Sequence, residues 1–104
     1  MQIVPAQPLA NQTVPIVLGN QGCSLNIYQT NYGLFMDVYV SGALIIGGVI
    51  CQNQNRIVRD LYLGFQGDFV WLDNTGNGND PYFTGIGTTY SLCYLEVSDL
   101  NGIG

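Results

Sequence analysis

Glycine and proline interrupt this chain so often that few stretches could hold a three-turn α-helix. The 104 residues include 14 glycines and four prolines, and both residue types break or weaken regular helices. The stretches between them are rich in Val, Ile, Tyr and Thr, which favour extended strands. The sequence therefore predicts an all-β protein.

Seven stretches have the composition or alternation of β-strands, separated by turn-forming residues. They are residues 13–18, 23–28, 34–41, 43–51, 56–65, 68–73 and 88–97. A chain of this length has room for one core, so residues 1–104 are predicted to form a single β domain with residues 98–104 as a flexible tail. Six or seven short strands predict a small antiparallel barrel or sandwich. The Gly47-Gly48 pair predicts a bulge or a barrel corner within it.

Alternation along the strands predicts which side chains are buried. It is clearest in residues 34–41, where Phe35, Asp37 and Tyr39 occupy the face opposite to the apolar one. Cys23 and Cys93 also alternate with polar or aromatic neighbours, as small buried residues do. A common core is predicted to contain Leu34, Met36, Val38, Val40, Leu61, Leu63, Cys93 and Leu95.

The charge composition excludes several classes of function. The chain has no histidine and no lysine, only Arg56 and Arg59 are basic, and seven carboxylates give a net charge of -5. Histidine and lysine supply most general bases and amine nucleophiles, so no catalytic residues are expected. A chain with two cations would not bind a nucleic-acid backbone stably. The apolar stretch at residues 43–50 is too short to enter and cross a membrane.

One loop partly resembles a calcium-binding loop. Residues 73–80 place carboxylate and amide side chains around two glycines, as calcium coordination requires. Thr75 stands at the third position and Thr84 at the twelfth, where a bidentate Glu should close the shell. A hairpin loop without metal is therefore favoured. Paired carboxylates for glycoside cleavage are conceivable among Asp68, Asp73 and Asp80, but no other site group accompanies them.

The aromatic residues exceed what one small core can enclose. Several lie on strand faces opposite the aliphatic ones, and aromatic residues with few charges are typical of the centres of protein interfaces. The simpler alternative is a sandwich that buries both faces internally. The sequence favours an interface, because a surface with so few charges would be poorly soluble alone. The predicted interface residues are Phe35, Tyr39, Arg56, Arg59, Tyr62, Tyr82 and Phe83.

Three segments carry a resemblance to a known family. They are residues 62–70 with the sequence YLGFQGDFV, residues 79–87 with NDPYFTGIG, and residues 90–95 with YSLCYL. The chain resembles the cyanophage-type baseplate plug family of contractile-tailed phages. The resemblance implies a β-structured virion component near the hub of the tail baseplate, assembled in the host cytoplasm, with no catalysis and no cofactor.

Two functions from different classes follow. The first is a non-enzymatic structural protein that contacts other baseplate proteins, such as hub, spike, tube or wedge components, or copies of itself in a symmetric ring. The alternative is a small carbohydrate- or ligand-binding β module, in which Trp71 and the tyrosines would line a shallow groove. The copy number and the exact neighbours do not follow from the sequence.

Overall fold

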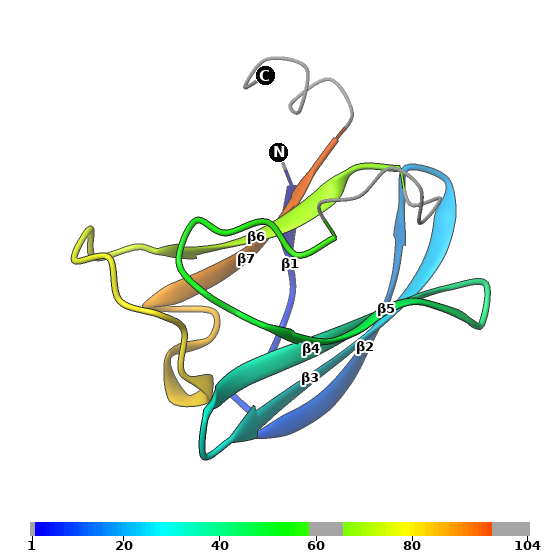
Figure 1. The fold of residues 1–104 in the computed structure, drawn as a ribbon. Coiled ribbons are helices and arrows are strands. Elements are labelled where there is room, and N and C mark those ends of the chain that lie inside the picture. The colour runs from blue at the N-terminus through cyan, green and yellow to red at the C-terminus, as the bar shows by residue number, and fades with distance from the viewer. Residues whose placement is uncertain (1, 59–65, 97–104) are drawn as a thin grey trace.

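The computed structural model describes residues 2–58 and 66–96, and it folds them into two antiparallel β-sheets (Figure 1). The four-stranded sheet has the order β2-β3-β4-β5 and the three-stranded sheet the order β1-β7-β6. The strands are β1 Gln2–Val4, β2 Asn11–Leu18, β3 Gln21–Thr30, β4 Gly33–Val40, β5 Ala43–Ile50, β6 Asp68–Asp73 and β7 Tyr90–Leu95, and the 3-10 turn η2 covers Phe83–Gly85. The all-β prediction is confirmed.

Tight hairpins connect the four strands of the larger sheet in sequence order. Two residues, Gly19 and Asn20, link β2 to β3, and two others, Ser41 and Gly42, link β4 to β5. All four have positive φ, which matches the turn type that suits the twist of two-residue hairpins. Both turns fall where the predicted strands are separated, at residues 19–22 and at Gly42.

A bulge bends the edge strand β5 at the predicted glycine pair. Met36 pairs with Val49 and Val38 with Ile46, so Gly47 and Gly48 together oppose one residue, Asp37, on β4. Gly48 has φ +65°, a conformation in which a side chain would be strained. The bulge aims the Gly48 N–H at the Asp37 carboxylate, with a distance of 2.7 Å.

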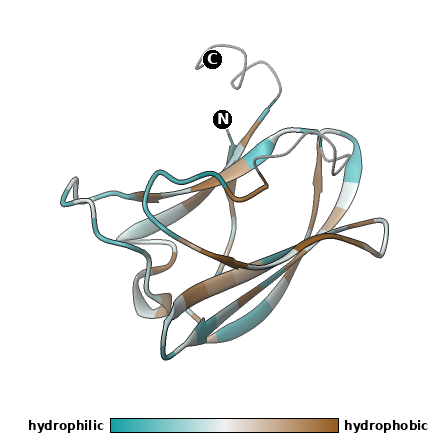
Figure 2. Cartoon of the chain, viewed as in Figure 1, coloured by the Kyte–Doolittle hydropathy of each residue, from teal (hydrophilic) through white to brown (hydrophobic). Residues whose placement is uncertain are grey.

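The core lies between the two sheets. Alternate residues of β3 and β4 point into it and are almost completely buried, and Phe69, Trp71, Leu92 and Tyr94 enter it from the smaller sheet. Figure 2 shows hydrophobic residues gathered on the strands and hydrophilic ones on the connections after β5 and β6. The predicted core residues Leu34, Met36 and Val38 are fully buried, and Val40 packs against them while partly buried.

The predicted face of β7 is wrong. Cys93 and Leu95 are buried, but with Val70 and Leu72 they form a separate cluster on the other side of the smaller sheet. Leu92 and Tyr94 face the main core instead. Both faces of β7 are apolar, so alternation alone did not distinguish them. Leu61 and Leu63 lie outside the described residues.

One further prediction needs correction, and the choice between barrel and sandwich is settled. The strand predicted at residues 56–65 is wrong in its described part, where Arg56 forms an isolated bridge to Val70 and residues 57–58 are a loop.

The sheets are not closed into a barrel: β2 and β5 are the edges of one sheet, β1 and β6 those of the other, and no ladder joins the sheets in the described ranges. Strand β1 was not predicted, because three residues are too few to show alternation. The predicted tail, 98–104, lies outside the described residues.

Candidate functional site

The outer face of the four-stranded sheet brings aromatic and aliphatic side chains together. This surface, which we call the outer face, consists of the residues of β2 to β5 that alternate with the buried ones along each strand. Register pairs Tyr28 with Phe35 and Phe35 with Ile50, forming one apolar row across three strands. Tyr39 pairs with Leu44 in a second row. Leu44 is 56% exposed, and Phe35 and Tyr39 are half-buried. The structure thus places the predicted interface residues Phe35 and Tyr39 on one surface.

A row of polar groups crosses all four strands between these apolar rows. The Thr13 hydroxyl lies 2.8 Å from Asn26 Oδ1, and Asn26 Nδ2 lies 3.5 Å from Asp37 Oδ2. Asp37 Oδ1 accepts the Gly48 N–H at 2.7 Å. These residues, Thr13, Asn26, Asp37 and Gly48, are named the polar row here. The four residues lie on four different strands. They meet only because all three strand pairs of the sheet have this register.

Asp37 links the polar row to the aromatic row beside it. The Tyr28 hydroxyl donates to Asp37 Oδ1 at 3.2 Å. Burial raises the pKa of Tyr28, and the negative charge of Asp37 adds to the increase. The Tyr28 and Phe35 rings are stacked with centroids 6.1 Å apart. These contacts hold Tyr28, Phe35 and Asp37 in fixed positions relative to one another.

Tyr82 and Phe83, two other predicted interface residues, lie on the β6–β7 connection. Their rings meet edge to face with centroids 4.9 Å apart. Phe83 packs against the core while its backbone N–H donates to Gln29 Oε1 at 3.2 Å, whereas Tyr82 is 47% exposed. The connection is therefore fastened to the end of β3, and only Tyr82 presents much of its ring to solvent.

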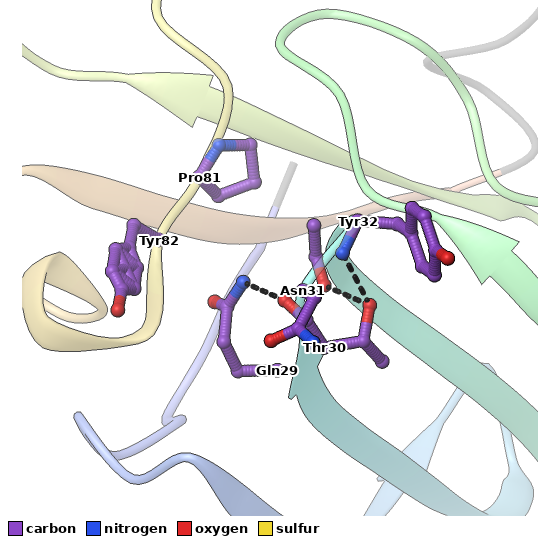
Figure 3. A pocket seen from close by; sticks show the side chains of 7 residues that line it. Gln29, Thr30, Asn31, Tyr32, Pro81 and Tyr82 are labelled. Carbon is purple, nitrogen blue, oxygen red and sulfur yellow. Dashed lines mark hydrogen bonds between the residues drawn. The ribbon is translucent and has the colours of Figure 1, made fainter.

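A hollow of about 490 Å³ opens between this connection and the β3–β4 turn (Figure 3). Tyr82 and Tyr32 stand at its opposite sides, with Gln29, Thr30 and Asn31 between them. Gln29 and Thr30 already use their polar side-chain atoms on neighbouring backbone groups. These two side chains are therefore committed to holding the fold around the hollow. Trp71, expected to line a groove in the alternative reading, is completely buried.

Arg56, predicted as an interface cation, lies at the buried carboxylate of Asp68. Its Nε atom is 3.9 Å from Asp68 Oδ2. Asp68 Oδ1 also accepts the backbone N–H groups of Ile57, Val58 and Phe69 at 3.2, 2.7 and 2.7 Å. Asp68 thereby fastens residues 56–58 to the edge of β6, which indicates a structural role. The remaining predicted interface residues, Arg59 and Tyr62, lie outside the described residues.

The aspartates of the loop that resembled a calcium site accept hydrogen bonds from the protein itself. Asp73 accepts the N–H and hydroxyl of Thr75 through Oδ1, at 2.9 and 2.6 Å, and the Asn79 N–H through Oδ2 at 2.9 Å. The Thr75 hydroxyl is the main cause of a lowered pKa at Asp73. Asp80 Oδ1 accepts the Asn53 N–H at 3.0 Å. Over residues 2–58 and 66–96, no group of three or more Cys, Asp or Glu side chains lies together as metal ligands would.

The three cysteines are free and buried, as predicted for Cys23 and Cys93. Burial raises the pKa of all three thiols, that of Cys51 to about 12. A thiol with such a pKa is protonated near neutral pH and is a weak nucleophile. The structure therefore gives the cysteines a packing role.

Sequence reasoning found only part of the outer face. Alternation placed Asp37 with Phe35 and Tyr39, but it did not identify Tyr28, Asn26 or Leu44 as their neighbours. Their positions depend on the register of three strand pairs and on the bulge. Turn-forming residues were predicted between these strands. Counting residues outward from each two-residue turn could have given the register of the paired strands.

A comparison with protein families matches most of the chain. A protein-family model described as "Cyanophage baseplate Pam3 plug gp18" covers residues 1–97 of the chain. No curated protein matches it. Among the described residues, no helix has the length and apolar character needed to cross a membrane.

Proposed function

The chain belongs to the cyanophage baseplate plug family, and from this premise we propose that it is a non-enzymatic structural component of a contractile tail baseplate. It resides in the virion tail after assembly in the host cytoplasm. Its partners are other baseplate proteins of the hub, spike, tube or wedge. It acts by occupying a fixed place among them and contributes no reaction chemistry.

The observation that carries this proposal is the composition of the outer face. Asp37 is the only Asp, Glu, Lys or Arg in residues 1–50, which include the whole four-stranded sheet. Around it lie three half-buried aromatic rings and the exposed side chains of Leu44 and Ile50. A rigid surface with many aromatic residues and one charge has the character of an interface centre.

The carboxylates support a structural role over an enzymatic one. Asp68, Asp73 and Asp80, the acids considered for glycoside cleavage, each accept backbone N–H groups that hold loops in place. A catalytic acid or base needs an oxygen directed at a substrate. The net charge of -5 also supports a component that does not retain DNA passing through a tail.

The proposal is tested by mass spectrometry of purified intact tails, which should contain the chain in stoichiometric amounts. The double variant Tyr39→Ala with Leu44→Ser should be soluble and folded, yet be depleted from tails by tenfold or more, since interface anchors contribute about 2 kcal/mol or more each. Tyr32→Ala is the matched control, because Tyr32 is 87% exposed and lies on the β3–β4 turn. Absence of the wild-type chain from tails would refute the proposal.

A further inference from the structure

We propose that Asp37 is the docking point for an arginine side chain of a basic partner protein, held between the aromatic rows of the outer face. This inference rests on the proposed function and names the chemistry of the partner. The proposed site consists of the Asp37 carboxylate and the rings of Phe35 and Tyr39 on either side of it along β4.

The two oxygens of Asp37 are used unequally. Oδ1 accepts the Gly48 N–H at 2.7 Å and the Tyr28 hydroxyl at 3.2 Å. Among residues 2–58 and 66–96, Oδ2 is reached only by Asn26 Nδ2, at 3.5 Å, which is the long limit of a hydrogen bond. The short bonds at Oδ1 fix the carboxylate in place, while Oδ2 keeps acceptor capacity for a charged donor.

The neighbouring rings suit a guanidinium group. Phe35 and Tyr39 each lie two residues from Asp37 on the same strand face, and successive residues of a strand rise by about 3.3 Å. The two ring positions are therefore separated by roughly 13 Å, with the carboxylate midway. A planar guanidinium can pair with the carboxylate and lie against an aromatic ring, which a lysine ammonium does less well.

The charge distribution indicates that the cation comes from a different protein. Residues 1–50 contain no Lys or Arg, so a second copy meeting this face symmetrically would bring only another Asp37. The two cations of the chain are Arg56, which faces Asp68 in its own chain, and Arg59. A second copy could therefore supply a cation only from outside residues 1–50. With a net charge of -5, the chain is attracted to a basic surface and repelled by its own copies.

The test measures binding of the full chain to baseplates purified from tails that lack it, at ionic strengths from about 50 to 300 mM. Asp37→Asn keeps an oxygen that accepts the Gly48 N–H but removes the charge. It should reduce binding about tenfold at low salt and make binding less dependent on salt. Asp80→Asn is the matched control, since it removes the same charge from an exposed loop and keeps the acceptor for Asn53.

Several outcomes would overturn the inference. The inference is wrong if Asp37→Asn and Asp80→Asn bind baseplates equally well. It is also wrong if binding of the wild type does not depend on salt, a measurement that requires no variant. Self-association of the wild type that Asp37→Asn abolishes would identify a second copy as the occupant. If the wild type binds baseplates and Asp37→Asn binds equally, only this inference fails. If the wild type does not bind at all, the proposed function fails with it.

Discussion

Asp68 shows how one side chain can determine the path of a whole segment. It is 2% exposed, yet it carries a carboxylate, and burial of an unpaired carboxylate would be costly. Three backbone N–H groups and Arg56 surround it. The adjoining Gly67 has φ +100°, and a Cβ there would lie 2.7 Å from the Tyr94 hydroxyl. Gly67 and Asp68, which lie within the YLGFQGDFV stretch of the family resemblance, are therefore two residues that this fold requires.

Replacing Asp68 with alanine should destabilise the protein by about 3 kcal/mol, because Val58 and Phe69 would lose the acceptor for their buried N–H groups. Asp68→Asn should cost less, since an amide oxygen can still accept these bonds. Urea unfolding at neutral pH, followed by Trp71 fluorescence, measures both free energies of unfolding. Equal losses in the two variants would show that the N–H groups do not depend on this oxygen.

At the scale of elements, the alternation of apolar and polar residues predicted buried side chains correctly where only one face of a strand meets the core. It failed where both faces are buried. It identified the buried residues of β4 because their neighbours Phe35, Asp37 and Tyr39 lie on the outer face. It chose the wrong face of β7, where both faces are buried. Ile57 and Val58 suggested a strand, but Asp68 holds their backbone in a loop. Long-range contacts of this kind leave no local pattern.

The edges of the larger sheet are protected against pairing with other strands. The edge strand β2 contains Pro15, which has no N–H to offer, and the other edge strand, β5, carries the Gly47-Gly48 bulge. Proline and bulges are common protections of exposed sheet edges. Contacts with neighbouring proteins are therefore expected through the outer face.

The two bulge glycines allow a matched comparison. Gly48→Ala should destabilise the protein by about 1 kcal/mol, because φ +65° strains an L-residue although no atom lies within 4 Å of the new Cβ. Gly47→Ala should cost less, since Gly47 does not have positive φ and its Cβ would make an ordinary contact 3.4 Å from Asp37 Oδ1. Thermal unfolding measures the difference. A larger loss at Gly47 would contradict the role given to the backbone of Gly48.

At the scale of the whole molecule, two sets of hydrogen bonds join the sheets. The Gln21 side chain exchanges bonds of 3.1 Å with the backbone of Gln66 in both directions, and the Tyr94 hydroxyl donates to the Gln66 carbonyl. Phe83 is bonded to Gln29 from the β6–β7 connection. The sheets also share one core, so we expect them to unfold together.

This expectation is tested with one probe in each sheet. Trp71 on β6 reports through its fluorescence, and Cys23 on β3 reports through the reactivity of its thiol in a variant with the other two cysteines replaced by serine or alanine. The two transitions should coincide in urea, as a single cooperative unit requires. A Cys23 thiol that becomes reactive well before the fluorescence changes would show that the larger sheet opens independently.

The polar row has a consequence for the chain before it meets its partners. It divides the apolar surface of the outer face into two narrow strips, one along Tyr28 and Phe35 and the other along Tyr39 and Leu44. Continuous apolar patches drive aggregation, and their tendency to do so grows with their size. Asp37 and Asn26 keep polar groups at the centre of the face, so we expect a newly made copy to associate less readily with other copies than an unbroken apolar face would.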